Sequence, residues 1–129
     1  MRILHTADWH IGKKLHGYDL IEDQSQIIDQ IIDIALAQEV EAVVIAGDLY
    51  DRSVPAVEAV KLLNEKIATI NLTHQLPLLV ISGNHDSPIR LETGKQWFTG
   101  TQFHMATSIE DSLKPVTIAD SQFFLLPYF

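Results

Sequence analysis

Three short clusters of acidic, histidine and asparagine side chains have the composition of metal-binding sites. They are Asp8 with His10, Asp48 after Gly47, and the Gly-Asn-His-Asp segment of residues 83–86. A carboxylate beside an imidazole suits Mn, Fe, Zn or Co better than Ca or Mg, because imidazole is the softer ligand. A carboxylate such as Asp48 could also bridge two ions, as in two-metal phosphoester hydrolases. These residue types therefore indicate metal-dependent hydrolysis.

Each cluster taken alone has a simpler structural interpretation. Asp8 and Asp48 could form turns after strands, and His85 bonded to Asp86 could be an ordinary buried pair. The interpretation changes when the three are taken together, because each directly follows an apolar segment. Three such coincidences in one short chain favour a common site.

The apolar segments before the clusters predict β-strands at residues 2–6, 43–45 and 78–81. The middle segment is a run of β-branched residues, which is typical of a strand covered on both faces. Open α/β sheets place their sites outside the carboxyl ends of the strands. We therefore expect the three clusters to converge on one edge of a sheet, with Asp8 and His10 pointing the same way from extended backbone.

Two amphipathic segments predict helices that cover this sheet. Apolar residues recur at helical spacing through residues 19–38 and again through residues 57–70. Ser53 could cap the second helix, with Pro55 in its first turn. The resulting β-α-β-α-β order predicts parallel strands joined by right-handed crossovers, and so an α/β fold.

The last third of the chain has a different pattern. A short helix is expected within residues 88–98, followed by strands at residues 103–106, 116–119 and 122–126. Because short strands separated by polar turns follow one another there, we expect antiparallel pairing among them.

The charge of the chain limits how it could bind nucleic acid. Nine basic and 17 acidic residues give a net charge of −8. This charge argues against a broad basic surface for sequence-independent DNA binding, although bound metal ions could themselves hold a phosphate. The sequence contains no cysteine and no apolar run long enough to span a membrane, and its first residues lack the long apolar segment of a signal peptide. We expect a soluble, cytoplasmic protein without a membrane partner.

The three clusters resemble, in their usual order, the signatures of the calcineurin-like metallophosphoesterase superfamily: Asp8-x-His10, Gly47-Asp48-x-x-Asp51 and Gly83-Asn84-His85-Asp86. Within it, residues 5–13 and 46–51 resemble a family of bacterial DNA nuclease subunits that work beside an ATPase subunit. The resemblance implies a sandwich of mixed sheets flanked by helices. It also implies two divalent metal ions, expected to be Mn²⁺. The implied activity is that of a double-strand exonuclease and a single-strand or hairpin endonuclease in DNA recombination, repair and replication.

The same resemblance implies a role for each matching residue. Asp8 and His10 would hold the first metal ion, Asp48 would bridge both ions, and Asn84 would hold the second. His85 would act as the acid or stabilise the transition state, and Asp86 would orient His85. Asp51 could contact substrate, but a surface ion pair is the simpler interpretation of its position.

The family pattern also contains histidines from a later Gly-His and Gly-His-x-His region, whereas His104 is the only histidine here after His85. We therefore expect residues 1–129 to be the N-terminal part of a truncated nuclease domain, inactive or weakly active alone. Its expected partners are DNA, the ATPase subunit and, in a longer protein, a second copy. The alternatives are a phosphoesterase acting on nucleotides or phosphoproteins, and a scaffold without catalysis.

Overall fold

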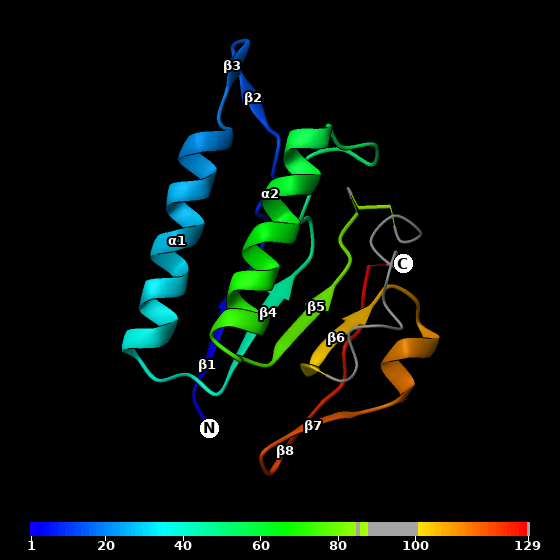
Figure 1. Cartoon of the computed structure of the whole chain (residues 1–129). Helices are drawn as coiled ribbons and strands as arrows, with labels where there is room; N and C mark the ends of the chain where they lie inside the picture. Colours follow the sequence, from blue (N-terminus) through cyan, green and yellow to red (C-terminus); the bar gives the residue numbers. More distant parts are fainter. Residues whose placement is uncertain (85, 88–100, 129) are drawn as a thin grey trace.

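The computed structural model describes residues 1–84, 86–87 and 101–128. Its centre is a four-stranded parallel sheet with the order β1-β4-β5-β6 (Figure 1). The strands are β1 (Ile3–Thr6), β4 (Ala42–Ala46), β5 (Leu78–Ile81) and β6 (Phe103–Ala106). Because all four strands run in one direction, their carboxyl ends meet at one edge of the sheet.

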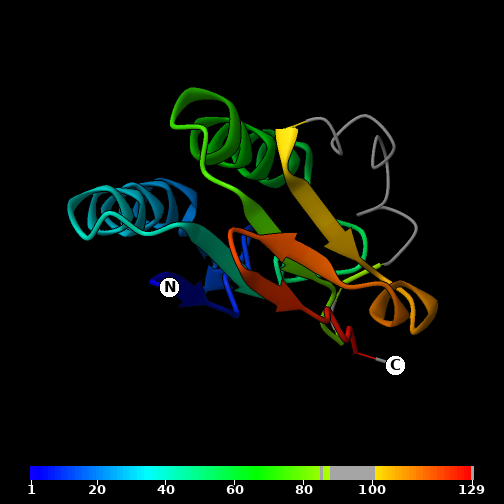
Figure 2. The ribbon, with the colours of Figure 1, turned by 90° about the horizontal axis from the view of Figure 1, so that it is seen from below.

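Helices α1 (Ile21–Ala37) and α2 (Val57–Ala68) lie side by side over one face of this sheet (Figures 1 and 2). A π-helical turn, Thr69–Thr73, extends α2. Ile28 and Ile32 of α1 and Leu63 of α2 are buried in the same apolar cluster as strand residues such as Val80. The predicted covering helices are therefore confirmed. Within the described residues, no helix combines the length and the apolar character needed to cross a membrane.

The opposite face of the sheet is covered by an antiparallel pair, β7 (Val116–Ile118) and β8 (Ser121–Phe123), as Figure 2 shows. Neighbouring residues of a strand point to opposite faces, so Leu79 packs on this side while Val80 faces the helices. Ile118 and Leu125 complete the second apolar cluster. Both faces of β4 and β5 are thus buried, in agreement with their uninterrupted apolar sequences.

The prediction of antiparallel pairing is wrong for the first of the three later strands. Strand β6 is parallel to β5, whereas β7 and β8 pair antiparallel. A parallel neighbour needs a connection of a dozen or more residues, and residues 82–102 provide one. The helix expected within residues 88–98 lies outside the described residues.

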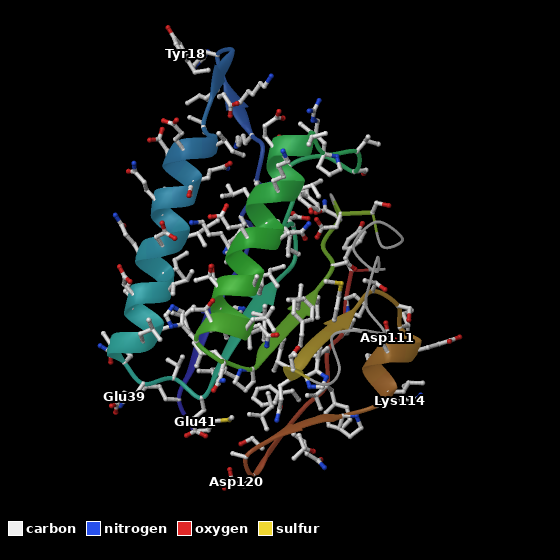
Figure 3. The ribbon with its side chains drawn as sticks, in the orientation of Figure 1. Tyr18, Glu39, Glu41, Asp111, Lys114 and Asp120 are labelled. Carbon is white, nitrogen blue, oxygen red and sulfur yellow. The ribbon has the colours of Figure 1, made fainter. Side chains whose placement is uncertain are left out.

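One local prediction also needs correction. Ser53 does not cap the second helix: Ala56 precedes α2 in an extended conformation, and no side chain caps the helix. Residues 14–19 form a small hairpin of two short strands, β2 (Lys14–Leu15) and β3 (Tyr18–Asp19). Tyr18 is exposed on this hairpin, which projects from the same end as the carboxyl ends of the strands (Figure 3).

An ion pair joins the two covering helices. Lys66 Nζ of α2 lies 2.6 Å from Asp29 Oδ1 of α1, and the Lys66 side chain is only 7% exposed. Leaving a buried ammonium without its partner costs more than the pair itself contributes, because the unpaired charge stays desolvated.

We therefore predict different effects for the two halves of this pair. Asp29→Ala should lower the free energy of unfolding by about 1 to 3 kcal/mol, because it leaves Lys66 unpaired. Lys66→Met removes the charge and keeps the apolar stem, so its effect should stay below about 1 kcal/mol. Urea denaturation measures both changes, and equal losses would contradict the interpretation.

Candidate metal centre

Asp8, His10 and Asp48 meet where β1 and β4 end. One ligand atom from each lies within 4.8 Å of the others. His10 Nε2 is 3.7 Å from Asp8 Oδ1 and 3.7 Å from Asp48 Oδ2. Atoms that bind one ion at about 2.1 Å lie roughly 3 to 3.5 Å apart, so a small contraction would let this set hold a cation. Asp48 is buried and Asp8 is exposed, so the centre opens to solvent on the Asp8 side.

The backbone at these three residues is left-handed, not extended as predicted for Asp8 and His10. Their φ angles are 56° at Asp8, 46° at His10 and 52° at Asp48. Non-glycine residues rarely adopt this conformation, although Asp and His do so more often than most. Hydrogen bonds between the two strand-end loops stabilise it: Asp8 N donates to Gly47 O at 3.1 Å, and His10 N donates to Asp48 O at 2.9 Å.

A fourth acidic residue adjoins this group. Asp51 Oδ1 lies 3.3 Å from His10 Nδ1, the ring nitrogen opposite the one that faces Asp8 and Asp48. A carboxylate beside the second nitrogen of a ligand histidine favours the tautomer whose free nitrogen faces the metal. The sequence interpretation of Asp51 as a surface ion pair missed this neighbour. The Gly-Asp-x-x-Asp spacing was the available signal.

Gly83 of the Gly-Asn-His-Asp segment packs directly against Asp48. A side chain at Gly83 would overlap the Asp48 carboxylate, at Oδ1, and the Asp48 backbone nitrogen. The two carboxylate oxygens of Asp48 therefore face different neighbours, Oδ2 toward His10 and Oδ1 toward Gly83. Asn84, the next residue, is exposed. The expected convergence of the three clusters is thus found for Asp8, His10 and Asp48, with Gly83 beside them.

Asp86 is buried and has a structural role that the sequence did not reveal. Its Oδ1 accepts a hydrogen bond from Tyr50 N at 3.1 Å, and its Oδ2 accepts from Leu49 N at 3.2 Å and Gly83 N at 2.9 Å. Asp86 therefore links the loop after β5 to the loop that carries Asp48. Burial, together with the nearby charge of Asp86, raises the pKa of Tyr50 to about 12, so this phenol stays neutral. His85 lies outside the described residues, and its orientation by Asp86 stays a prediction.

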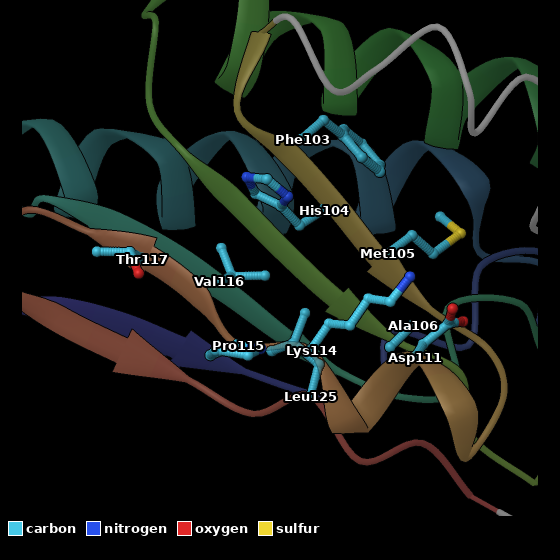
Figure 4. A pocket seen from close by; sticks show the side chains of 10 residues that line it. All are labelled: Phe103, His104, Met105, Ala106, Asp111, Lys114, Pro115, Val116, Thr117 and Leu125. Atoms are coloured by element: carbon cyan, nitrogen blue, oxygen red, sulfur yellow. The ribbon is translucent and has the colours of Figure 1, made fainter.

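His104 is not part of this centre. It lies on β6 in a cavity of about 340 Å³, with Lys114 and Asp111 also in the lining (Figure 4). Burial lowers the pKa of His104. Among the described residues, the group of histidine and acidic side chains close enough to share an ion is Asp8, His10 and Asp48.

The profile of the calcineurin-like phosphoesterase family matches residues 1–128, and the chain therefore belongs to this family. Two curated relatives, from Staphylococcus saprophyticus and Staphylococcus epidermidis, are each 44% identical over 128 residues, and both are named as the SbcD component of the nuclease SbcCD. Each match covers 99% of this chain and 34% of the relative, so the chain spans about a third of the length of these relatives. The names agree with the resemblance of residues 5–13 and 46–51 to SbcD, the nuclease subunit of the bacterial SbcCD complex.

The hydrogen bonds of Asp86 lead to a stability prediction. Asp86→Asn keeps one acceptor oxygen but turns an NH₂ group toward backbone donors, so we expect a loss of about 2 to 4 kcal/mol in the free energy of unfolding. Chemical denaturation measures the loss. Asp33→Asn is the matched control, because Asp33 is exposed on α1 and should change stability by less than about 0.5 kcal/mol. Similar small effects of both substitutions would contradict the linking role of Asp86.

Proposed function

We propose that this chain supplies part of the metal centre of a DNA nuclease that hydrolyses phosphodiester bonds. The observation that carries the proposal is the meeting of Asp8, His10 and Asp48 in a member of the calcineurin-like phosphoesterase family. The names of the two relatives direct the proposal toward DNA rather than another phosphoester.

In this proposal the centre holds two divalent metal ions. Asp8 and His10 bind the first ion, Asp48 bridges, and Asn84 binds the second. The bridging role is supported by the Asp48 carboxylate, whose Oδ2 faces His10 while Oδ1 faces the Gly83 segment. Mixed carboxylate, imidazole and amide donors suit Mn²⁺. When bound, the two ions would lower the pKa of a coordinated water and offset charge on the phosphoryl oxygens.

The residues of the chain itself would position and protonate the reacting groups. Asp51 would hold the His10 ring with Nε2 toward the metal, as their 3.3 Å separation suggests. His85 would give a proton to the leaving oxygen or stabilise charge in the transition state, and Asp86 would orient it. The roles of His85 rest on the sequence motif.

The longer relatives suggest the setting of this activity. We propose that residues 1–129 are the N-terminal part of a metallophosphoesterase nuclease domain, and that later residues supply further metal ligands. The protein would assemble with an SbcC-type ATPase subunit and pair with a second copy of itself. It would act as a double-strand exonuclease and a single-strand or hairpin endonuclease in DNA recombination and repair. Such a substrate would place the protein in the cytoplasm.

One observation favours a second substrate class. The net charge of −8 opposes long-range attraction to DNA, so small nucleotides or phosphoproteins are the alternative substrates for the same centre. A scaffold without catalysis is the third interpretation, and metal binding distinguishes it from the other two.

Metal binding tests the centre directly. Calorimetry should detect Mn²⁺ binding to this chain, and Asp48→Asn should weaken it at least about tenfold, because a bridging carboxylate would lose its charge. Asp120→Asn is the matched control, since Asp120 is exposed in the turn between β7 and β8 and should leave the affinity unchanged. No binding to the unmodified chain, or equal binding to the Asp48 variant, would contradict the proposed centre.

Substrate comparison tests the proposed reaction in a protein of the relatives' length. With Mn²⁺, we expect linear and hairpin DNA to be cleaved much faster than mononucleotides or a phosphoserine peptide. His85→Ala should reduce the cleavage rate by about 100-fold or more while leaving the Mn²⁺ affinity within about twofold, because it removes a proton donor and no ligand. Preference for the mononucleotide would favour the alternative substrate class.

A further inference from the structure

Gln24 forms hydrogen bonds with the loop that carries His10. It lies in the first turns of α1, more than ten residues after that loop. Gln24 Oε1 accepts a hydrogen bond from Gly12 N at 3.0 Å. Gln24 Nε2 donates to His10 O at 2.9 Å, with Trp9 O at 3.4 Å as a weaker second acceptor. One half-buried amide therefore binds backbone groups on both sides of His10.

The loop that carries His10 is held by hydrogen bonds on two sides. On one side, carbonyl groups of the loop after β4 accept hydrogen bonds from N–H groups of the His10 loop. His10 N donates to Asp48 O and Ile11 N donates to Leu49 O, both at 2.9 Å. Gln24 donates instead to the carbonyl groups of Trp9 and His10. His10 is thus held by backbone contacts to the Asp48 loop and by one side chain from helix α1.

Because the backbone of this loop is left-handed, these hydrogen bonds affect the position of His10 as well as the stability of the fold. His10 has a φ of 46° and Gly12 a φ of 93°, both in the left-handed region. For a histidine this conformation persists only where surrounding contacts determine it. The His10 peptide also sets the direction of the imidazole, whose Nε2 must point between Asp8 and Asp48. A change at Gln24 would therefore shift the ligand itself.

We infer that Gln24 is a positioning residue for the metal ligand His10, a role that rests on the proposed metal centre. Glutamine suits this role because its amide both accepts from Gly12 and donates to His10. Methionine has a similar volume but cannot make either bond. Asparagine keeps the amide but is one methylene shorter, so it cannot reach both groups from the same helix position.

The test compares Mn²⁺ affinity and stability in this chain with Gln24→Met or Gln24→Asn. The same two changes at Gln26 are the matched controls, because Gln26 is exposed on the same helix. Calorimetry well below the unfolding temperature measures affinity on folded protein, and hydrogen exchange follows the Gly12 amide. In the Gln24 variants we expect a Kd about tenfold higher and Gly12 exchange about tenfold faster. The Gln26 variants should match the unmodified chain.

The possible results distinguish a positioning role of Gln24 from a purely structural role and from the absence of a metal centre. If the Gln24 variants lose stability but bind Mn²⁺ with a Kd within about twofold of the unmodified chain, Gln24 is only structural and the inference is overturned. If the unmodified chain does not bind Mn²⁺, both the centre and the role of Gln24 fail. If Gln24→Met does not fold, Gln24→Asn decides, because its amide preserves the polarity of the position.

Discussion

The pairing of the two strand-end loops is the constraint on which the candidate centre depends. Backbone hydrogen bonds from Asp8 N to Gly47 O and from His10 N to Asp48 O hold three non-glycine residues in left-handed conformations. Each such residue costs about 1 kcal/mol or more, and the parallel β1–β4 pair supplies the neighbouring contacts that offset this cost. The sheet therefore stabilises a local geometry that neither loop would adopt alone.

Charge is the second feature of this arrangement. Asp8, Asp48 and Asp51 all lie close to the His10 ring, in a chain whose net charge is already −8. Carboxylates this close repel one another, and a divalent cation between Asp8 and Asp48 would relieve that repulsion. A cation that binds only the folded chain also stabilises it, so metal binding and folding should be coupled.

The position of the centre could be predicted from the sequence, because parallel α/β topology brings strand ends together whatever the details of the loops. Val43 to Ile45 predicted a buried strand, and the polar residues after it marked the edge of the sheet. The pairing of β6 could not be predicted, since a short apolar segment such as Phe103 to Ala106 indicates a strand but not its neighbour. The strand with which β6 pairs depends on the route of the chain between β5 and β6.

The hydrogen bonds around the candidate metal ligands also could not be predicted from the sequence. The left-handed φ of His10 arises from hydrogen bonds to residues almost forty positions away, and the contacts of Gln24 and Asp86 cross between separate elements. Such contacts leave no periodic pattern. At Ser53 the sequence contains a signal that the structure does not use. Serine is a good capping residue, but the helix begins further along, after Ala56.

The most direct measurement of the central claim is anomalous diffraction from crystals of this chain soaked in Mn²⁺. We predict an anomalous peak between Asp8, His10 and Asp48, within bonding distance of His10 Nε2. A peak elsewhere on the acidic surface, with none at this position, would contradict the claim that these three residues form a metal centre.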